Sequence, residues 1–345
     1  SFFIHERTLR VRHFQEINKT VFHNGLTLIT EKLDHFFTVA VGFWIKSGTI
    51  NETIDKHGIA HFIEHMNFKG TLKRNSEEIS FFIESKGGQL NAFTSQEVTC
   101  YYARAMPEYL HEAVELLSDI VFQSTFPEDE LEKEKKVVFD EIRDVEDNPS
   151  EWAADLFYEE LFKGHPLAYP ILGTEKSIQG LTRNDLKNFI SEHYDPSNII
   201  VSVAGPVDHV EIKSMLEETL KLSNKKKRKE IEIFHKDRYI SSVCCKKKRS
   251  SQIHTVIGLP MPEAAHRDKW PLTVLNTYLG AGMSSLLFME IREKLGIAYS
   301  IYSFLDFYQT GGAWGIYWAS EKKNYPKVID EIKKIFRETI MKKMN

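Results

Sequence analysis

Residues 57–70 of the chain, HGIAHFIEHMNFKG, hold three histidines spaced four residues apart, His57, His61 and His65, with Glu64 directly before the last. Residues i and i+4 of an α-helix lie on one face, so the imidazoles of His61 and His65 can reach one metal ion together. Glu64 would project beside them, where a carboxylate can touch a metal-bound water without being a ligand. The H-x-x-E-H pattern therefore indicates a zinc-dependent hydrolytic centre. Polar residues on an ordinary helix remain the alternative interpretation.

A catalytic zinc ion typically takes three protein ligands and leaves one position open for water. The long helix predicted from Pro127 to about Asp147 supplies candidates, because it carries an apolar stripe made of Leu131, Val138, Ile142 and Val145. Glu134 and Glu141 fall within that stripe, two turns apart. A carboxylate on a buried face is costly unless it is paired or bound to a metal, which favours a functional role for both. The remaining acids of this helix are expected on a solvated face, among them Glu128, Asp129, Glu132 and Glu146.

The elements that must position these residues alternate between strand and helix signals. Strands are predicted at residues 25–33, 37–48, 89–95, 98–106 and 198–205. Helices are predicted at residues 57–69, 76–86, 107–122, 127–147 and 181–194. More helix is predicted between 147 and 162, and a further helix follows the strand at 198–205 and ends at about residue 222.

A charged run, NKKKRKE at residues 224–230, interrupts the pattern and is predicted to be a solvated linker. The pattern then restarts with strands at 239–245, 253–260, 298–305 and 312–320, and with helices at 270–280, 286–296 and 325–345. Each half is thus predicted to contain a sheet with helices, and a weak internal duplication is plausible.

Composition limits the function classes. The chain has 345 residues, which favours two domains, and 42% hydrophobic with 27% charged residues indicate a globular protein. Its 45 Lys and Arg against 49 Asp and Glu suggest neither a nucleic-acid partner nor a membrane role. Three cysteines cannot form a disulfide framework, which favours a reducing compartment, a bacterial cytoplasm or a mitochondrial-type matrix. No apolar run approaches the roughly 20 residues of a membrane span.

Four separated motifs occur in a characteristic order: HGIAHFIEHMNFKGT, LNAFTSQEVTCYYARAM, EKKVVFDEIRDVEDNP and LGAGMSSLLFMEIREKLGIAYSIYSF. Through them the chain resembles the pitrilysin family of zinc metallopeptidases over about residues 18–320. The likeness is greatest to its short-chain branch, the catalytic beta subunit of mitochondrial processing peptidase and its bacterial relatives. The resemblance implies an α+β fold of two similar α/β-roll domains, each a mostly antiparallel sheet packed with helices, that form half of a clamshell chamber.

The implied division is a catalytic domain at residues 18–223, a linker at 224–238 and a second homologous domain at 239–345. Members of this branch usually continue past the position of Asn345, so the second domain is expected to be incomplete.

The resemblance also assigns roles to the residues singled out above. It implies one zinc ion held by His61, His65 and Glu141, the last lying 76 residues after His65. Glu64 matches the general base that takes a proton from the attacking water and later gives it to the leaving amine. Glu134 matches an acid that orients the ligands without binding metal.

Substrate contacts are implied at two places. The stretch LNAFTS resembles an edge strand to which an extended peptide adds as a further strand, with Asn91, Ala92 and Phe93 against the peptide. Arg292 and Tyr299 match a pair that the second domain sends across to the substrate, where their donors suit a developing oxyanion. A surface Arg and a strand Tyr are the alternative for this pair.

The function implied is a zinc endopeptidase for unstructured or presequence-like peptides, working as a homodimer or with a related subunit because one chain supplies half of the chamber. The alternative is a non-catalytic structural or assembly subunit of the same family, which would generally lack the zinc ligands. His57 is expected to be structural. Glu84, Glu97, Asp140 and Asp144 are candidates for favouring basic peptides.

Overall fold

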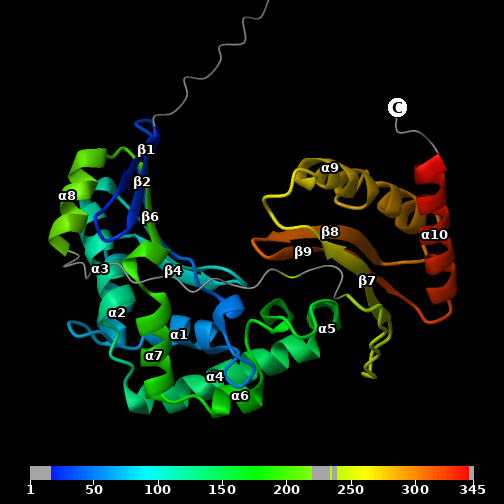
Figure 1. Ribbon diagram of the computed structural model, residues 1–345, viewed down its shortest axis with the longest axis horizontal. Helices are drawn as coiled ribbons and strands as arrows, with labels where there is room; N and C mark the ends of the chain where they lie inside the picture. Colours follow the sequence, from blue (N-terminus) through cyan, green and yellow to red (C-terminus); the bar gives the residue numbers. More distant parts are fainter. Residues whose placement is uncertain (1–16, 220–233, 235–238, 342–345) are drawn as a thin grey trace, which may run out of the picture.

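The structure is a computed structural model that describes residues 17–219, 234 and 239–341. It is a mixed α+β protein built on two sheets, so the predicted fold class is confirmed (Figure 1). The predicted linker at residues 224–238 lies outside the described residues except for Phe234. Within the described part, no helix is long and apolar enough to cross a membrane.

The first sheet has six strands in the order β1-β2-β6-β3-β5-β4. Their bounds are β1 Ile17–Val21, β2 Thr27–Lys32, β3 Val39–Ile45, β4 Gln89–Thr94, β5 Thr99–Ala105 and β6 Ile199–Gly205. Neighbouring strands are antiparallel except β2 and β6, which run parallel. The sheet is therefore mostly antiparallel, as predicted, and β4 forms one of its edges.

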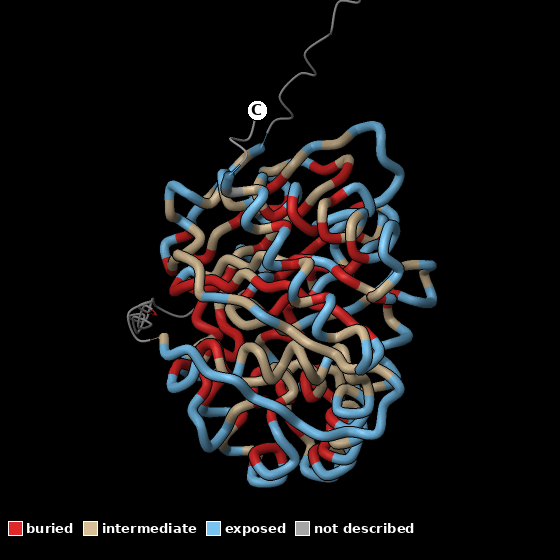
Figure 2. The backbone as a smooth tube through the Cα atoms, turned by 90° about the vertical axis from the view of Figure 1, so that its right-hand side faces the viewer, coloured by how far each residue is buried: buried red, intermediate tan, exposed pale blue. Residues whose placement is uncertain are grey.

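Helices cover one face of this sheet. The helices of this part are α1 Ile59–Asn67, α2 Ser76–Glu84, α3 Leu110–Gln123, α4 Glu128–Asp147, α5 Pro149–Leu161, α6 Glu175–Gln179, α7 Arg183–His193 and α8 His209–Thr219. Of these, α1, α2, α3 and α8 contact the strands, α4 and α7 pack on α1, and α5 and α6 pack on α4. Strand β3 shows why helices pack on this sheet, because Val41, Phe43 and Ile45 alternate toward the helices and are fully buried, whereas Trp44 faces the other way. Figure 2 shows that the buried parts of the backbone gather in the interior and the exposed parts lie at the periphery.

The second sheet has three antiparallel strands in the order β7-β9-β8. They are β7 Ile253–Met261, β8 Ser300–Tyr308 and β9 Gly311–Ser320, and they are accompanied by α9 Lys269–Leu279, α10 Tyr325–Met341 and a π-helical segment at Phe288–Lys294. The core of this part contains Trp318, which is completely buried beside Ile316, Ile332 and Ile335. The helix predicted at 286–296 is therefore present in the wider π form.

Helix α5 joins the two parts of the molecule by packing against β7 (Figure 1). The Tyr158 hydroxyl of this helix donates a hydrogen bond to Asp306 on β8. The rings of Phe157 and Phe304 meet edge to face beside that bond, with centroids 5.7 Å apart. A small apolar cluster that includes Phe162 and Ala313 continues the contact. One face of α5 is thus fixed by the second sheet.

The strand predicted at residues 239–245 is wrong, because the chain there forms no strand. Ile240 is 80% and Val243 90% exposed, so the alternating apolar residues pack on no sheet. The segment instead contacts α5 through a side chain: the Ser242 hydroxyl donates to Glu160, 3.0 Å away. Conversely, β1 was not predicted, because its residues are polar or exposed and its pairing with β2 is a tertiary feature.

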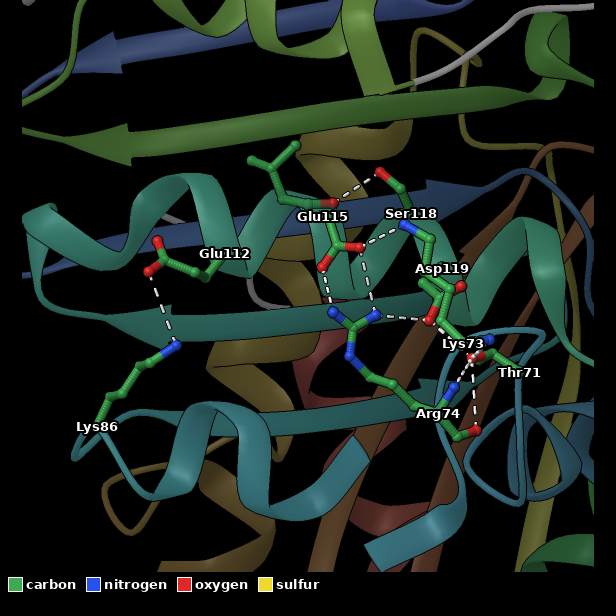
Figure 3. Close-up of polar contacts among 9 residues, drawn as sticks. Thr71, Lys73, Arg74, Lys86, Glu112, Glu115, Ser118 and Asp119 are labelled. Carbon is green, nitrogen blue, oxygen red and sulfur yellow. Dashed lines mark hydrogen bonds and ion pairs between the residues drawn. The ribbon is translucent and has the colours of Figure 1, made fainter. Parts of the chain in front are cut away.

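The loop that follows α1 is held by an ion-pair network with α3 (Figure 3). The Arg74 guanidinium lies 2.5 Å from a Glu115 oxygen and 2.7 Å from Asp119 Oδ2, and Thr71 Oγ1 donates to the same Asp119 oxygen at 2.7 Å. Asp119 is almost completely buried. Because a buried carboxylate must be paired, this network fixes the loop directly after the histidine helix.

Candidate active site

Helix α1 presents the histidines because its other face is apolar. The buried residues of the helix are Ile59, Ala60, Phe62, Ile63, Met66 and Asn67. His61, Glu64 and His65, at spacings of three and four residues, are left on the face that points away from this core. The helix follows Gly58, whose φ of 90° lies in the left-handed region that glycine tolerates.

A buried carboxylate fixes the start of α1. The two oxygens of Glu52 accept hydrogen bonds from the backbone N–H of Gly58 at 2.7 Å and of Ala60 at 2.8 Å. Burial raises the pKa of Glu52 to about 8, partly opposed by these two bonds. His57 lies just outside the helix, and its Nδ1 is 2.7 Å from the carbonyl oxygen of Ile54. The first turn of α1 is therefore held by groups from the preceding loop.

His61 and His65 meet Glu141, which comes from α4. The Nε2 atoms of His61 and His65 lie 3.9 Å and 3.6 Å from Glu141 Oε2, and one ligand atom from each residue falls within 4.8 Å of the other two. Glu141 Oε2 and His61 Nδ1 are buried without a hydrogen-bond partner in the described part of the chain. A buried carboxylate oxygen aimed at two imidazole nitrogens is satisfied by a divalent cation, so the three side chains fit a metal.

Glu134, also on α4, contacts the His65 imidazole on the side opposite Glu141. Its Oε2 lies 3.1 Å from His65 Nδ1, and its Oε1 lies 2.7 Å from the Lys69 ammonium. An ionised carboxylate only accepts hydrogen bonds, so Nδ1 donates and the lone pair of Nε2 is directed toward Glu141. Partial burial acts to raise the pKa of Glu134, but the bonds from His65 and Lys69 outweigh it and the net shift is downward. The tautomer needed for metal binding is thus set by this contact.

The charges of the two histidines differ. Burial, helped by repulsion from His65, lowers the pKa of His61 to about 3, so His61 is neutral and offers a lone pair. Burial also lowers the pKa of His65, but the bond with Glu134 and the charges of Glu141, Glu134 and Glu64 outweigh it and the net shift is upward. The carboxylates of Glu141, Glu134 and Glu64 thus make the surroundings of His65 negative, which favours a cation beside this imidazole.

Glu64 lies beside this group without joining it. Burial raises the pKa of Glu64, while a hydrogen bond from Thr94 and the charge of His65 oppose the rise. Thr94 Oγ1 donates to Glu64 Oε2 at 2.5 Å. A partly buried carboxylate with a raised pKa, next to a candidate metal site, has the properties of a general base.

A pocket of about 500 Å³ opens in front of Glu64 and His61. One wall is the edge strand, through Ala92, Phe93 and Thr94. The opposite walls come from α5, with Glu151, Ala154, Asp155 and Tyr158, and from residues 167–172. Burial, with the charges of Glu151 and Glu159, raises the pKa of Asp155 to about 6. The pocket thus has an acidic side opposite the strand.

The structure separates the other predicted substrate residues. Ala92 and Phe93 line the pocket, whereas Asn91 is exposed and its side chain accepts a hydrogen bond from the Ala92 N–H at 2.8 Å. Arg292 and Tyr299 lie beside each other in the second part, the guanidinium carbon 5.9 Å from the ring centroid. Neither is among the residues that line the pocket. The structure therefore groups this pair but does not bring it to the histidines.

Sequence patterns did not identify Glu151 and Asp155 as pocket residues. Their i, i+4 spacing directly after the long helix was the available signal. Glu84, Glu97, Asp140 and Asp144, the acids considered instead, do not line the pocket. Thr94 and Lys69 were also missed, although both lie within the quoted motifs.

Known protein families match most of the chain. Residues 28–175 match the family described as insulinase (peptidase family M16), and residues 180–345 match the domain described as peptidase M16 inactive domain. Over 301 residues the chain is 38% identical to the uncharacterized zinc protease YmxG of Bacillus subtilis, covering 87% of this chain and 73% of YmxG. It is 35% identical over 320 residues to the uncharacterized zinc protease ML0855 of Mycobacterium leprae, covering 92% and 72% of the two chains.

Two solved structures share the fold. A protease from Helicobacter pylori superposes with a TM-score of 0.87 at 25% identity, over 94% of this chain and 81% of that one. The peptidase M16 inactive domain from Pseudomonas fluorescens gives a TM-score of 0.88 at 19% identity, over 96% and 80%. All five residues of the histidine and carboxylate group, His61, Glu64, His65, Glu134 and Glu141, fall inside the first family match.

Proposed function

This chain belongs to the insulinase family of peptidases (peptidase family M16), and from that membership we propose that it is a zinc-dependent endopeptidase. Its substrates are unstructured peptides, including presequence-like ones. The observation that carries the proposal is the convergence of His61, His65 and Glu141, with a buried carboxylate oxygen that has no hydrogen-bond partner in the described residues.

Each residue of the site would have its own role in the reaction. His61, His65 and Glu141 would hold the zinc ion, and Glu134 would keep the His65 imidazole in the required tautomer and orientation. When bound, zinc lowers the pKa of water and polarises a carbonyl group. Glu64 would accept the proton of the attacking water and deliver it to the leaving amine.

Peptides would bind along the edge strand β4. An extended peptide can pair with the free edge of a sheet through backbone hydrogen bonds, which give affinity without requiring a sequence. Ala92 and Phe93 line the pocket from this strand, and Asn91 is exposed beside them. The substrate would thus lie between β4 and α5.

Selectivity would come from the opposite wall. Glu151 supplies negative charge to that wall, and Asp155, whose pKa is raised to about 6 by burial and by the charges of Glu151 and Glu159, adds a second negative charge above about pH 6. A Lys or Arg side chain of the peptide, close to the scissile bond, is the natural counter-ion. This supports a preference for basic peptides.

Arg292 and Tyr299 are proposed to reach the substrate from the second part of the molecule or from a second subunit. Their exposure supports this, since Tyr299 is 75% exposed and the two side chains lie together. A homodimer, or a pair with a related subunit, would supply the second wall of the chamber.

The proposal is tested by metal analysis together with cleavage. Purified protein reconstituted with zinc should hold one ion per chain, and His61→Ala and His65→Ala should lose it. The wild type should cleave an Arg-containing peptide, and a chelator should stop the reaction until zinc is restored. A protein that binds no zinc after reconstitution contradicts the proposal and favours the alternative role of a structural or assembly subunit.

A further inference from the structure

We propose that Thr94 is a positioning residue, whose hydroxyl holds the Glu64 carboxylate in the orientation that proton transfer requires. The inference rests on the proposed function and adds to it a residue outside the histidine and glutamate motifs. It also gives the edge strand β4 a second task beside binding the peptide.

The contact itself is short and directional. Thr94 Oγ1 donates to Glu64 Oε2 at 2.5 Å, from a strand that lies 30 residues further along the chain than α1. Residues of β4 alternate in burial, and Ala92 and Thr94 are on its less exposed face. A hydroxyl that donates to a charged oxygen makes a stronger bond than one between neutral groups. One carboxylate oxygen is thereby fixed, and the other is left for a water molecule.

Thr94 is itself held rigidly. It is the last residue of β4 and pairs with Thr99 of β5, and the Ser95 N–H donates to the Val98 carbonyl oxygen at 2.8 Å to close the hairpin. A side chain on a paired strand is placed more accurately than one on an open loop. The position of the hydroxyl is therefore set by the sheet.

The hairpin turn is also docked onto the loop that precedes α1. The Ile50 N–H donates to the Gln96 carbonyl oxygen at 2.8 Å. A Cβ atom at Gly48 would lie 2.2 Å from the Ser95 carbonyl oxygen, so the two backbones approach as closely as only glycine allows. That same loop carries Glu52, which fixes the start of α1. The loop therefore positions both the hairpin that carries the Thr94 hydroxyl and the helix that carries the Glu64 carboxylate.

A purely structural role makes a different prediction. If the hydroxyl only satisfied a partly buried carboxylate, its loss would lower stability and leave turnover per folded molecule unchanged. If it sets the orientation of Glu64, its loss should lower kcat while the KM for the peptide and the zinc content stay the same.

Three variants separate these roles. Thr94→Val keeps the shape and removes the hydroxyl, and Thr94→Ser keeps the hydroxyl. Thr99→Val is the matched control, because Thr99 faces Thr94 across the hairpin and donates to the Ser47 carbonyl oxygen at 3.0 Å. With zinc-loaded protein, T94V should lose kcat about 10- to 100-fold, with KM and zinc content unchanged and kcat recovered in T94S. T99V should lower Tm and keep kcat.

A structural measurement tests the inference independently of cleavage. In a crystal structure of T94V, with or without zinc, the Glu64 carboxylate should leave the orientation seen in the wild type, and it should return in T94S. A Glu64 that is unmoved in T94V, or T94S as impaired as T94V, overturns the inference. If the wild type cleaves no peptide, the proposed function fails, and the position of Glu64 in the T94V crystal still decides whether Thr94 holds it.

Discussion

Glu134 Oε2 lies 3.1 Å from His65 Nδ1, and this contact joins helix α4 to the histidine helix α1. It makes Nδ1 the donor and directs the opposite nitrogen of the ring toward Glu141, 3.6 Å away. Two residues of α4 that are seven positions apart thus have different roles: Glu141 is a candidate metal ligand, and Glu134 orients the candidate ligand His65. Several measurable consequences of the site depend on relationships of this kind.

Replacing Glu134 by Gln should weaken zinc binding about 10- to 100-fold, because the amide keeps the shape but loses the charge that orients and polarises His65. Competition with a chromophoric chelator measures the affinity. Glu128→Gln is the control, since Glu128 is an exposed acid of the same helix. Equal affinities in the wild type and E134Q would show that the contact has no influence on the metal.

Replacing Arg74 by Ala should lower the free energy of unfolding by about 3 kcal/mol, because Asp119 would remain buried without its cation. Arg74→Lys should recover part of the loss, and Lys133→Ala, which breaks only surface ion pairs with Glu130 and Asp129, should leave stability unchanged. Urea denaturation measures all three. A stable R74A would mean that the network in Figure 3 contributes little.

Cleavage of basic peptides should depend on the ionisation of Asp155. Burial, with the charges of Glu151 and Glu159, raises the pKa of Asp155 to about 6, so the carboxyl is neutral below that pH and charged above it. The kcat/KM ratio of an Arg peptide to its uncharged citrulline analogue should therefore rise as pH increases through about 6. We expect a change of about tenfold, which corresponds to about 1.4 kcal/mol.

Asp155→Asn should make this ratio independent of pH near 6. Asp140→Asn, at an exposed acid that does not line the pocket, should retain the dependence. Taking the ratio of the two peptides cancels pH effects on the metal ligands, which both substrates share. A ratio that is flat in the wild type would remove Asp155 from substrate selection.

Local patterns predicted much of the fold and the centre of the site. The apolar face of α1 and the stripe of α4 placed His61, His65 and Glu134 correctly on helices, and the three candidate ligands do converge. Such patterns succeed because helix periodicity and burial are properties of a short window.

The parts that failed depend on tertiary contacts. Residues 239–245 alternate like a strand, yet they pair with no strand of the described sheets, whereas β1, whose apolar residues Ile17 and Val21 are exposed, is formed through pairing with β2. Glu151 and Asp155 became visible as pocket residues only when α5 was placed opposite β4. Periodicity contains no information on which distant element lies across a cleft.

The central claim is that the zinc-loaded protein hydrolyses peptides with Glu64 as its base. Hydrolysis of a quenched fluorescent, Arg-containing peptide by the wild type and by Glu64→Gln, with zinc content measured in both, tests it most directly. The account predicts equal zinc in the two proteins and a rate in E64Q lower by about 100-fold or more. Equal rates of hydrolysis in two proteins that hold zinc equally would contradict it.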